Sequence, residues 1–120
     1  MNLCPQPHEY PTEIRAKRSE LLRIEQNIRQ LSDAVAIFSE QFDEMVAFDE
    51  TLANEAQRKA KRAKLRRENE GYTHALAALQ NAQDAKVELE IDLQFLCEEF
   101  SWLKLERRER IALREGHWAA

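Results

Sequence analysis

Residues 21–52 read LLRIEQNIRQLSDAVAIFSEQFDEMVAFDETL, and their apolar side chains recur in steps of three and four that lapse only at Asp49. This spacing is typical of the contact seam of a coiled coil. A second seam with the same spacing follows Gly71, so the two seams predict an all-α fold, a long antiparallel coiled-coil helical hairpin. The first seam contains Leu21, Ile24, Ile28, Leu31, Val35, Phe38, Phe42, Met45 and Leu52; the second contains Tyr72, Ala75, Leu79, Ala82, Lys86, Leu89, Leu93, Leu96, Phe100 and Leu103.

The composition agrees with this fold class. The chain has 120 residues with only two glycines and three prolines, too few for a turn-rich β fold. One stretch, Val87–Phe95, alternates apolar and polar residues as a half-buried strand does. Because no other segment offers a partner strand, we interpret it as helical.

The expected element boundaries follow from prolines, caps and glycines. All three prolines fall within residues 1–11, and Thr12 is a suitable N-cap. Asn54 and Gln57 resemble a capping pair, which leaves room for a break near residue 54. Gly71 is suited to the left-handed turn after a helix, so facing residues should have numbers that add to about 140. The predicted elements are a tail (1–11), a hairpin (12–115) made of a helix (12–67), a turn (68–72) and a helix (73–115), and a tail (116–120).

Several large apolar residues lie off both seams and would face water in a single hairpin. A second hairpin is the simplest cover, so we expect self-association into a dimeric four-helix bundle or a higher oligomer. The residues expected at this oligomer interface are Ile37, Val46, Phe48, Val87, Ile91, Phe95, Trp102 and Leu105.

Residues 58–67 hold seven cations and no acid. Such a segment can neutralise the phosphates of a nucleic acid without reading its sequence, although cations also complement a helix C-terminus and keep a helix soluble. The formal net charge of −4 argues against a protein that coats nucleic acid along its whole length. The candidate nucleic-acid-binding residues are Arg58, Lys59, Lys61, Arg62, Lys64, Arg66 and Arg67.

A second basic group, Arg15, Lys17 and Arg18, follows the proline-containing tail and has few acidic neighbours at helical pairing distance. Together with a self-associating helical body and a near-terminal Trp118, it resembles the layout of small coiled-coil adaptors that serve ParA-type ATPases in plasmid partition or carboxysome distribution. The resemblance implies that these three cations contact the ATPase and that the protein links it to a cargo. The short tail departs from this layout, since such adaptors carry a longer disordered region.

Motifs for catalysis are missing from the sequence. The three histidines are dispersed, Cys4 and Cys97 lack metal-ligand spacing, and no Gly-rich loop is present. We therefore expect no enzymatic activity, cofactor, metal or small-molecule substrate. Without a signal sequence or an apolar run of membrane-spanning length, the expected location is the cytoplasm. The expected function is that of an adaptor or scaffold; the alternatives are a sequence-nonspecific nucleic-acid binder and a structural subunit of a larger complex.

Overall fold

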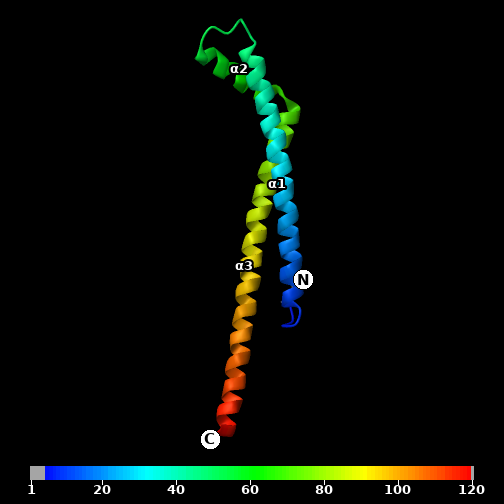
Figure 1. The fold of residues 1–120 in the computed structure, drawn as a ribbon, viewed down its shortest axis with the longest axis vertical. Helices are drawn as coiled ribbons and strands as arrows, with labels where there is room; N and C mark the ends of the chain where they lie inside the picture. The colour runs from blue at the N-terminus through cyan, green and yellow to red at the C-terminus, as the bar shows by residue number, and fades with distance from the viewer. Residues whose placement is uncertain (1–4, 120) are drawn as a thin grey trace. The chain divides into compact units, whose positions relative to one another are not determined.

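The structure, a computed structural model, describes residues 5–119, of which 117–119 are described by their backbone alone. It contains three helices, α1 (Tyr10–Ala47), α2 (Glu55–Glu68) and α3 (Glu70–Ala119), and no strand within that range (Figure 1). The predicted all-α helical hairpin is confirmed. The helical interpretation of Val87–Phe95 is also confirmed, because this stretch lies within α3.

The chain forms two compact units. The terminal unit contains α1 through Arg23 and α3 from Lys86 onward, and the loop unit contains Ile24–Ala85. Within each unit α1 and α3 pack against each other through aromatic rings. Tyr10 stacks on Phe100 in the terminal unit, with ring centroids 5.6 Å apart, and Phe38 meets Tyr72 edge-on in the loop unit at 6.2 Å.

These ring pairs correct the expected register. In both of them the residue numbers add to 110 rather than to about 140. The chain therefore reverses direction near residue 55 and not at Gly71, as Figure 1 shows where α2 leaves the end of α1 across the loop at residues 48–54. Accordingly, Phe38 contacts Tyr72 and Phe100 contacts Tyr10, in place of the expected pairing of Phe38 with Phe100.

Local hydrogen bonds explain why the predicted helix 12–67 is divided into α1 and α2. The Asp49 carboxylate accepts hydrogen bonds from the backbone N–H of Thr51, at 3.0 Å, and from its hydroxyl. Such bonds compete with the helical backbone pattern. Asn54 then caps α2 by accepting from the Gln57 N–H at 2.9 Å, while Gln57 Oε1 accepts from the Ala53 N–H at 2.6 Å. The capping pair read from the sequence is thus present, and it starts a separate helix.

The joint between α2 and α3 is one extended residue, Asn69, instead of the predicted turn over 68–72. Its N–H donates to the Leu65 carbonyl at 3.1 Å, and its side chain accepts from the Tyr72 N–H at 2.8 Å, so it closes one helix and caps the next. Gly71 lies inside α3, and no glycine within residues 5–119 has a positive φ. A Cβ at Gly71 would stand 2.9 Å from Phe38 Cζ, so the glycine serves close helix packing.

Helix α1 begins two residues earlier than predicted, and the described part of the 1–11 tail is folded. Glu9 donates its N–H to the Gln6 carbonyl at 2.8 Å, and its carboxylate accepts from the Gln6 N–H at 3.2 Å. Pro11 is tolerated because the first helical turn needs no donor there. Tyr10 is only 3% exposed, and its burial on Phe100 fixes this segment.

Each unit has a narrow core along the seams. Phe42 and Val46, 3% and 1% exposed, anchor the loop unit. Ile14 and Leu89 are buried with Tyr10 in the terminal unit. In that unit α3 runs past the start of α1 (Figure 1). Every residue from 107 to 116 is consequently exposed. The C-terminal helix also continues through Gly116, where the sequence predicted its end.

Candidate functional site

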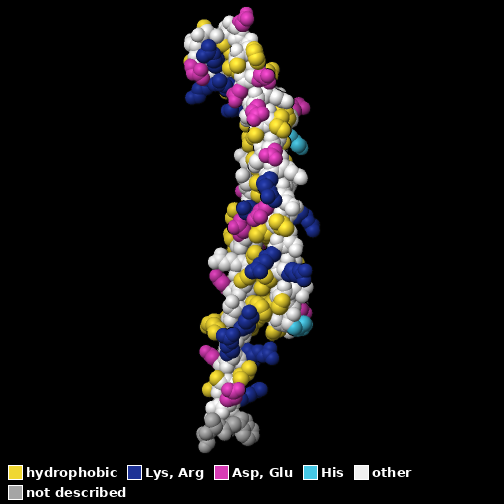
Figure 2. Space-filling model, in the orientation of Figure 1, with side chains coloured by type: hydrophobic (Ala, Val, Ile, Leu, Met, Phe, Trp, Pro, Cys, Tyr) yellow, Lys and Arg dark blue, Asp and Glu magenta, His cyan; other side chains and the backbone are white. Residues whose placement is uncertain are grey.

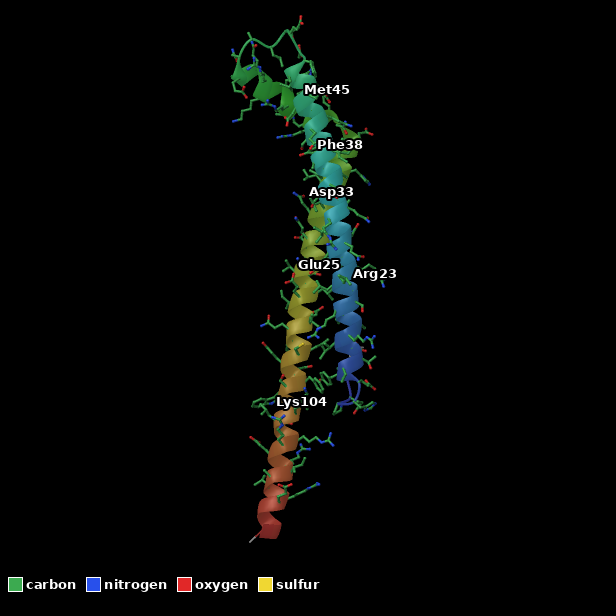
Figure 3. All side chains as sticks on the ribbon, viewed as in Figure 1. Arg23, Glu25, Asp33, Phe38, Met45 and Lys104 are labelled. Atoms are coloured by element: carbon green, nitrogen blue, oxygen red, sulfur yellow. The ribbon has the colours of Figure 1, made fainter. Side chains whose placement is uncertain are left out.

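A basic groove lies in the terminal unit between the first turns of α1 and the facing part of α3. Its volume is about 710 Å³, and no acidic residue lines it. Arg15 and Arg18 of α1 stand on one side and Lys104 of α3 on the other. Figure 3 labels Lys104 at the level where α1 begins. The groove is therefore a concave cationic surface.

The lining of the basic groove also contains an apolar part. Ile14, Leu22 and Phe100 contribute to it, and Lys104 Nζ sits 4.1 Å above the centroid of the Phe100 ring. This cation–π contact holds the ammonium over the groove. A groove with an apolar part and a cationic rim suits an acidic segment that carries an apolar anchor.

Tyr10 positions the groove by joining its two walls. Its ring lies parallel to that of Phe100, with 4° between the planes, and its hydroxyl donates to Glu99 Oε2 at 3.1 Å. Both contacts fix the start of α1 against α3. Of the three predicted partner residues, the structure brings Arg15 and Arg18 into the groove. Lys17 does not line it and is partly covered.

Two cations of the basic segment 58–67 on α2 are paired with acidic residues that lie outside this segment. Arg62 Nε lies 3.1 Å from Asp43 Oδ1 on α1, as an ion pair without a hydrogen bond, and its Nη1 donates to Glu55 Oε1 at 3.2 Å. Arg58 also pairs with Glu55, at 3.5 Å. These two predicted phosphate ligands are thus occupied within the fold.

Two carboxyl groups near α2 are shifted by these contacts. The hydrogen bond from Arg62 lowers the pKa of Glu55, and the Thr51 hydroxyl lowers the pKa of Asp49. A lowered carboxyl pKa favours the folded state above the ordinary carboxyl pKa, and this contribution is lost as the pH falls. Because Glu55 is exposed and Asp49 is only partly covered, solvent screens the effect.

Four cations of α2 are exposed and form no ion pair within residues 5–119: Lys59, Lys64, Arg66 and Arg67. Figure 2 shows dark-blue side chains gathered at this helix. Arg66 and Arg67 also rim a groove of about 800 Å³ between α2 and the start of α3. Lys61 is half-buried. The exposed four are the part of the predicted nucleic-acid surface that faces solvent.

Five large apolar residues of the terminal unit are exposed in a row on α3 that we call the outer stripe. Each member lies two positions from a seam residue, about 200° around the helix, so the stripe faces away from the side that packs on α1. Figure 2 shows exposed hydrophobic side chains beside the cations on this part of α3. Its members are Val87, Ile91, Phe95, Trp102 and Leu105, which are 56%, 61%, 60%, 65% and 49% exposed.

The other predicted interface residues divide between surface and core. Ile37 and Phe48 are 55% and 78% exposed. Val46 is only 1% exposed, so the prediction that it lies at an oligomer interface was wrong. Its side chain faces the core of the loop unit, on the same side of α1 as Phe42. Position 46 continues the covered side because it lies one helical turn after Phe42.

None of the helices within residues 5–119 has an apolar stretch that could span a lipid bilayer. No group of three or more His, Cys, Asp or Glu side chains converges as metal ligands between residues 5 and 119. The side chain of Trp118 lies outside the described residues.

Comparison with known proteins supplies no relative: neither protein-family models, nor curated proteins, nor solved structures give a match.

The cations of the basic groove come together because α1 and α3 pack antiparallel. The sequence prediction includes Arg15 and Arg18 but not Lys104. Once Tyr10 is placed on Phe100, helical geometry brings Lys104 beside the first turns of α1.

Proposed function

We propose that the protein is a non-enzymatic, self-associating helical adaptor that links a cargo to a ParA-type positioning or partition ATPase. The observation that carries the proposal is the outer stripe, five large apolar side chains exposed in one row. Single exposed apolar residues are common on soluble proteins, whereas a contiguous row is typical of an interaction surface. Self-association through it would present several copies of the basic groove to one partner.

The basic groove is the proposed contact for the ATPase. Arg15, Arg18 and Lys104 carry three charges with no acid among the groove residues, and Ile14, Leu22 and Phe100 supply apolar surface. Such a groove favours an acidic surface with an apolar side chain at its centre. The chemistry is complementary to a protein partner rather than to a substrate.

This proposal is tested by measuring binding to, and ATPase stimulation of, each ParA-type ATPase encoded in the same genome. The double variant Arg15→Glu, Arg18→Glu should weaken binding about tenfold or more, because two cations become anions in the groove. The double variant Arg23→Glu, Arg29→Glu makes the same charge change on the same helix outside the groove and should bind normally. Equal loss in both pairs, or no binding by the unmodified protein, contradicts the proposal.

A second candidate function, sequence-nonspecific nucleic-acid binding, is favoured by the four exposed cations of α2. Lys59, Lys64, Arg66 and Arg67 have no acidic partner within residues 5–119, so phosphates would not have to displace one. Contacts to four phosphates predict that affinity for duplex DNA falls roughly 100-fold between about 50 and 200 mM salt.

Changing those four residues to glutamate should abolish a gel shift at low salt. Arg62 is left unchanged because it pairs with Asp43 within the fold. The control changes four exposed cations of α1, Arg15, Arg18, Arg23 and Arg29, to glutamate. A shift that both quadruple variants lose equally reflects net charge alone and rejects a site on α2.

A further inference from the structure

The side of α3 that packs on α1 continues past the point where α1 begins. Phe100 lies on this side, stacked on Tyr10, and Lys104 lies one turn further along, over the Phe100 ring. Beyond it every residue from 107 to 116 is exposed, and Figure 1 shows α3 running on alone. An isolated helical segment of this length is marginal in water, because helical stability normally comes from packing. The exposed end of α3 thus presents a helix face that α1 does not cover.

The α3 wall of the basic groove leads directly onto this exposed end. Cys97, Ser101 and Lys104 line the groove from α3, in steps of four and three. The same steps lead on to Arg108 and Ile111. Residues spaced in this way share one face of a helix. The groove and the exposed end of α3 therefore form one continuous surface within the terminal unit.

The continued face is basic. Four exposed cations lie three, four or seven positions from Ile111 and so share its side of the helix: Lys104, Arg107, Arg108 and Arg114. None of them forms an ion pair with a described residue. The two acids of this stretch, Glu106 and Glu109, lie about 140° and 160° around the helix from Ile111. Glu115, four positions after Ile111, is the acid at which the basic face ends.

Apolar side chains accompany these cations along the surface. Ile111 is 45% exposed among them, and Ile14, Leu22 and Phe100 line the groove. Ile111 follows Phe100 by eleven positions, about three helical turns, so the two lie on the same side of α3. The phosphates of a nucleic acid would leave this apolar surface in water, whereas an acidic protein segment with its own apolar row would cover it.

We propose that the basic groove and the exposed end of α3 form one docking surface for an acidic amphipathic helix of the partner protein. This inference rests on the proposed function and adds the secondary structure, the charge and the length of the segment that binds. Charge complementarity is the argument for this occupant, since six cations border the surface: Arg15, Arg18, Lys104, Arg107, Arg108 and Arg114. A helix in this place also supplies packing that the end of α3 lacks.

The length of the surface sets the length of the docked helix. Cys97 and Arg114 are 17 positions apart on α3, a distance on the order of 25 Å. A partner helix of about 17 residues, close to five turns, spans it. Its acidic side chains would flank an apolar row that recurs in steps of three and four, matching the spacing on α3.

A synthetic peptide tests the surface without the ATPase. The probe is a fluorescein-labelled peptide of about 18 residues, with leucines in steps of three and four, glutamates on both flanks of the leucine row and alanines on the opposite side. Fluorescence anisotropy measures its binding to the full chain. A second peptide with serine in place of each leucine, and a short DNA duplex, should each bind at least tenfold more weakly. Equal affinity for either of them overturns the proposal, because the surface would then select charge alone.

Arg108→Glu and Arg110→Glu form a matched pair for the charge contribution. Both arginines are exposed and lack an ion pair within the described residues, but they lie about 160° apart around α3. Arg108→Glu should weaken binding of the leucine peptide at least tenfold, because it places an anion on the basic face. Arg110→Glu makes the same change in net charge and should bind within twofold of the unmodified chain. Equal loss in the two variants overturns the docking face.

Ile111→Ser and Leu113→Ser form the matching pair for the apolar contribution. They too lie about 160° apart, and Leu113 is the more exposed, at 75% against 45%. Ile111→Ser should weaken binding about fivefold, and Leu113→Ser should not. On binding, the circular dichroism of the mixture should gain helical signal, and hydrogen exchange should slow across residues 107–114. A bound peptide that leaves exchange there unchanged contradicts docking on the exposed end of α3.

The same variants separate failure of this inference from failure of the proposed function. If an ATPase binds the unmodified chain and both Arg108→Glu and Arg110→Glu equally well, the inference fails and the proposed function stands. If the leucine peptide binds as expected but no ParA-type ATPase does, the docking surface stands and the proposed function fails. Self-association that Arg108→Glu abolishes, with no binding of the peptide, assigns the surface to a second copy of the chain and overturns the inference.

Discussion

Phe42→Ala should lower the free energy of unfolding by about 3–5 kcal/mol, the range typical of removing a buried aromatic side chain. Phe42 is 3% exposed, and its ring lies 6.3 Å from that of Phe38 and 5.5 Å from that of Tyr72, at 72° to the latter. Replacing it removes the most buried ring of this three-ring cluster, which links α1 and α3 in the loop unit. Chemical denaturation followed by circular dichroism measures the change.

Phe48→Ala provides the control for this prediction. Phe48 is 78% exposed, so its truncation should change the free energy of unfolding by no more than about 0.5 kcal/mol. Both variants remove the same atoms six residues apart, and only the burial differs. A loss of similar size in the two variants would contradict the packing of the loop unit.

The seams could be predicted from the sequence because helical periodicity is a local property. All named seam residues of α3, from Tyr72 to Leu103, are at least partly covered in the structure. In α1 the side chain of Met45 departs from the pattern, being 54% exposed, while Val46 takes the buried position. The shift occurs in the last turn before the loop, where the pairing with α3 ends.

The position at which the chain reverses direction could not be predicted as well as the seams, because the sequence offers two competing turn signals. Gly71 is the stronger turn residue by propensity, but its lack of a Cβ is used for contact with Phe38. The weaker signal, the lapse of the seam at Asp49 followed by the Asn54 cap, marks the reversal. Choosing between them requires the tertiary contact, which propensity does not contain.

The register also decides which cations meet in the candidate site. With facing numbers near 140, Lys104 would lie opposite residues of α1 far from Arg15. The observed pairing of Tyr10 with Phe100 brings Lys104 to the groove instead. Charge clusters within one helix can be read from a sequence, whereas a cluster shared by two helices depends on their register.

Tyr10→Ala should release the start of α1 from α3 and lower the free energy of unfolding by about 3 kcal/mol. The variant loses a ring that is 3% exposed and stacked on Phe100 at 5.6 Å, together with the hydrogen bond to Glu99 at 3.1 Å. Since this contact joins the two walls of the basic groove, the effect should be local. Hydrogen exchange should quicken most in the first three turns of α1.

Tyr10→Phe separates the hydroxyl from the ring in this prediction. It keeps the stacking on Phe100 and removes only the bond to Glu99, so we expect a loss of about 1 kcal/mol and near-normal exchange in α1. Partner binding through Arg15 and Arg18 should then survive in Tyr10→Phe and weaken in Tyr10→Ala, because only the latter frees the helix that carries both arginines. Equal protection of α1 in Tyr10→Ala and the unmodified protein would show that Ile14 and the seam alone hold this segment, and that the groove does not depend on Tyr10.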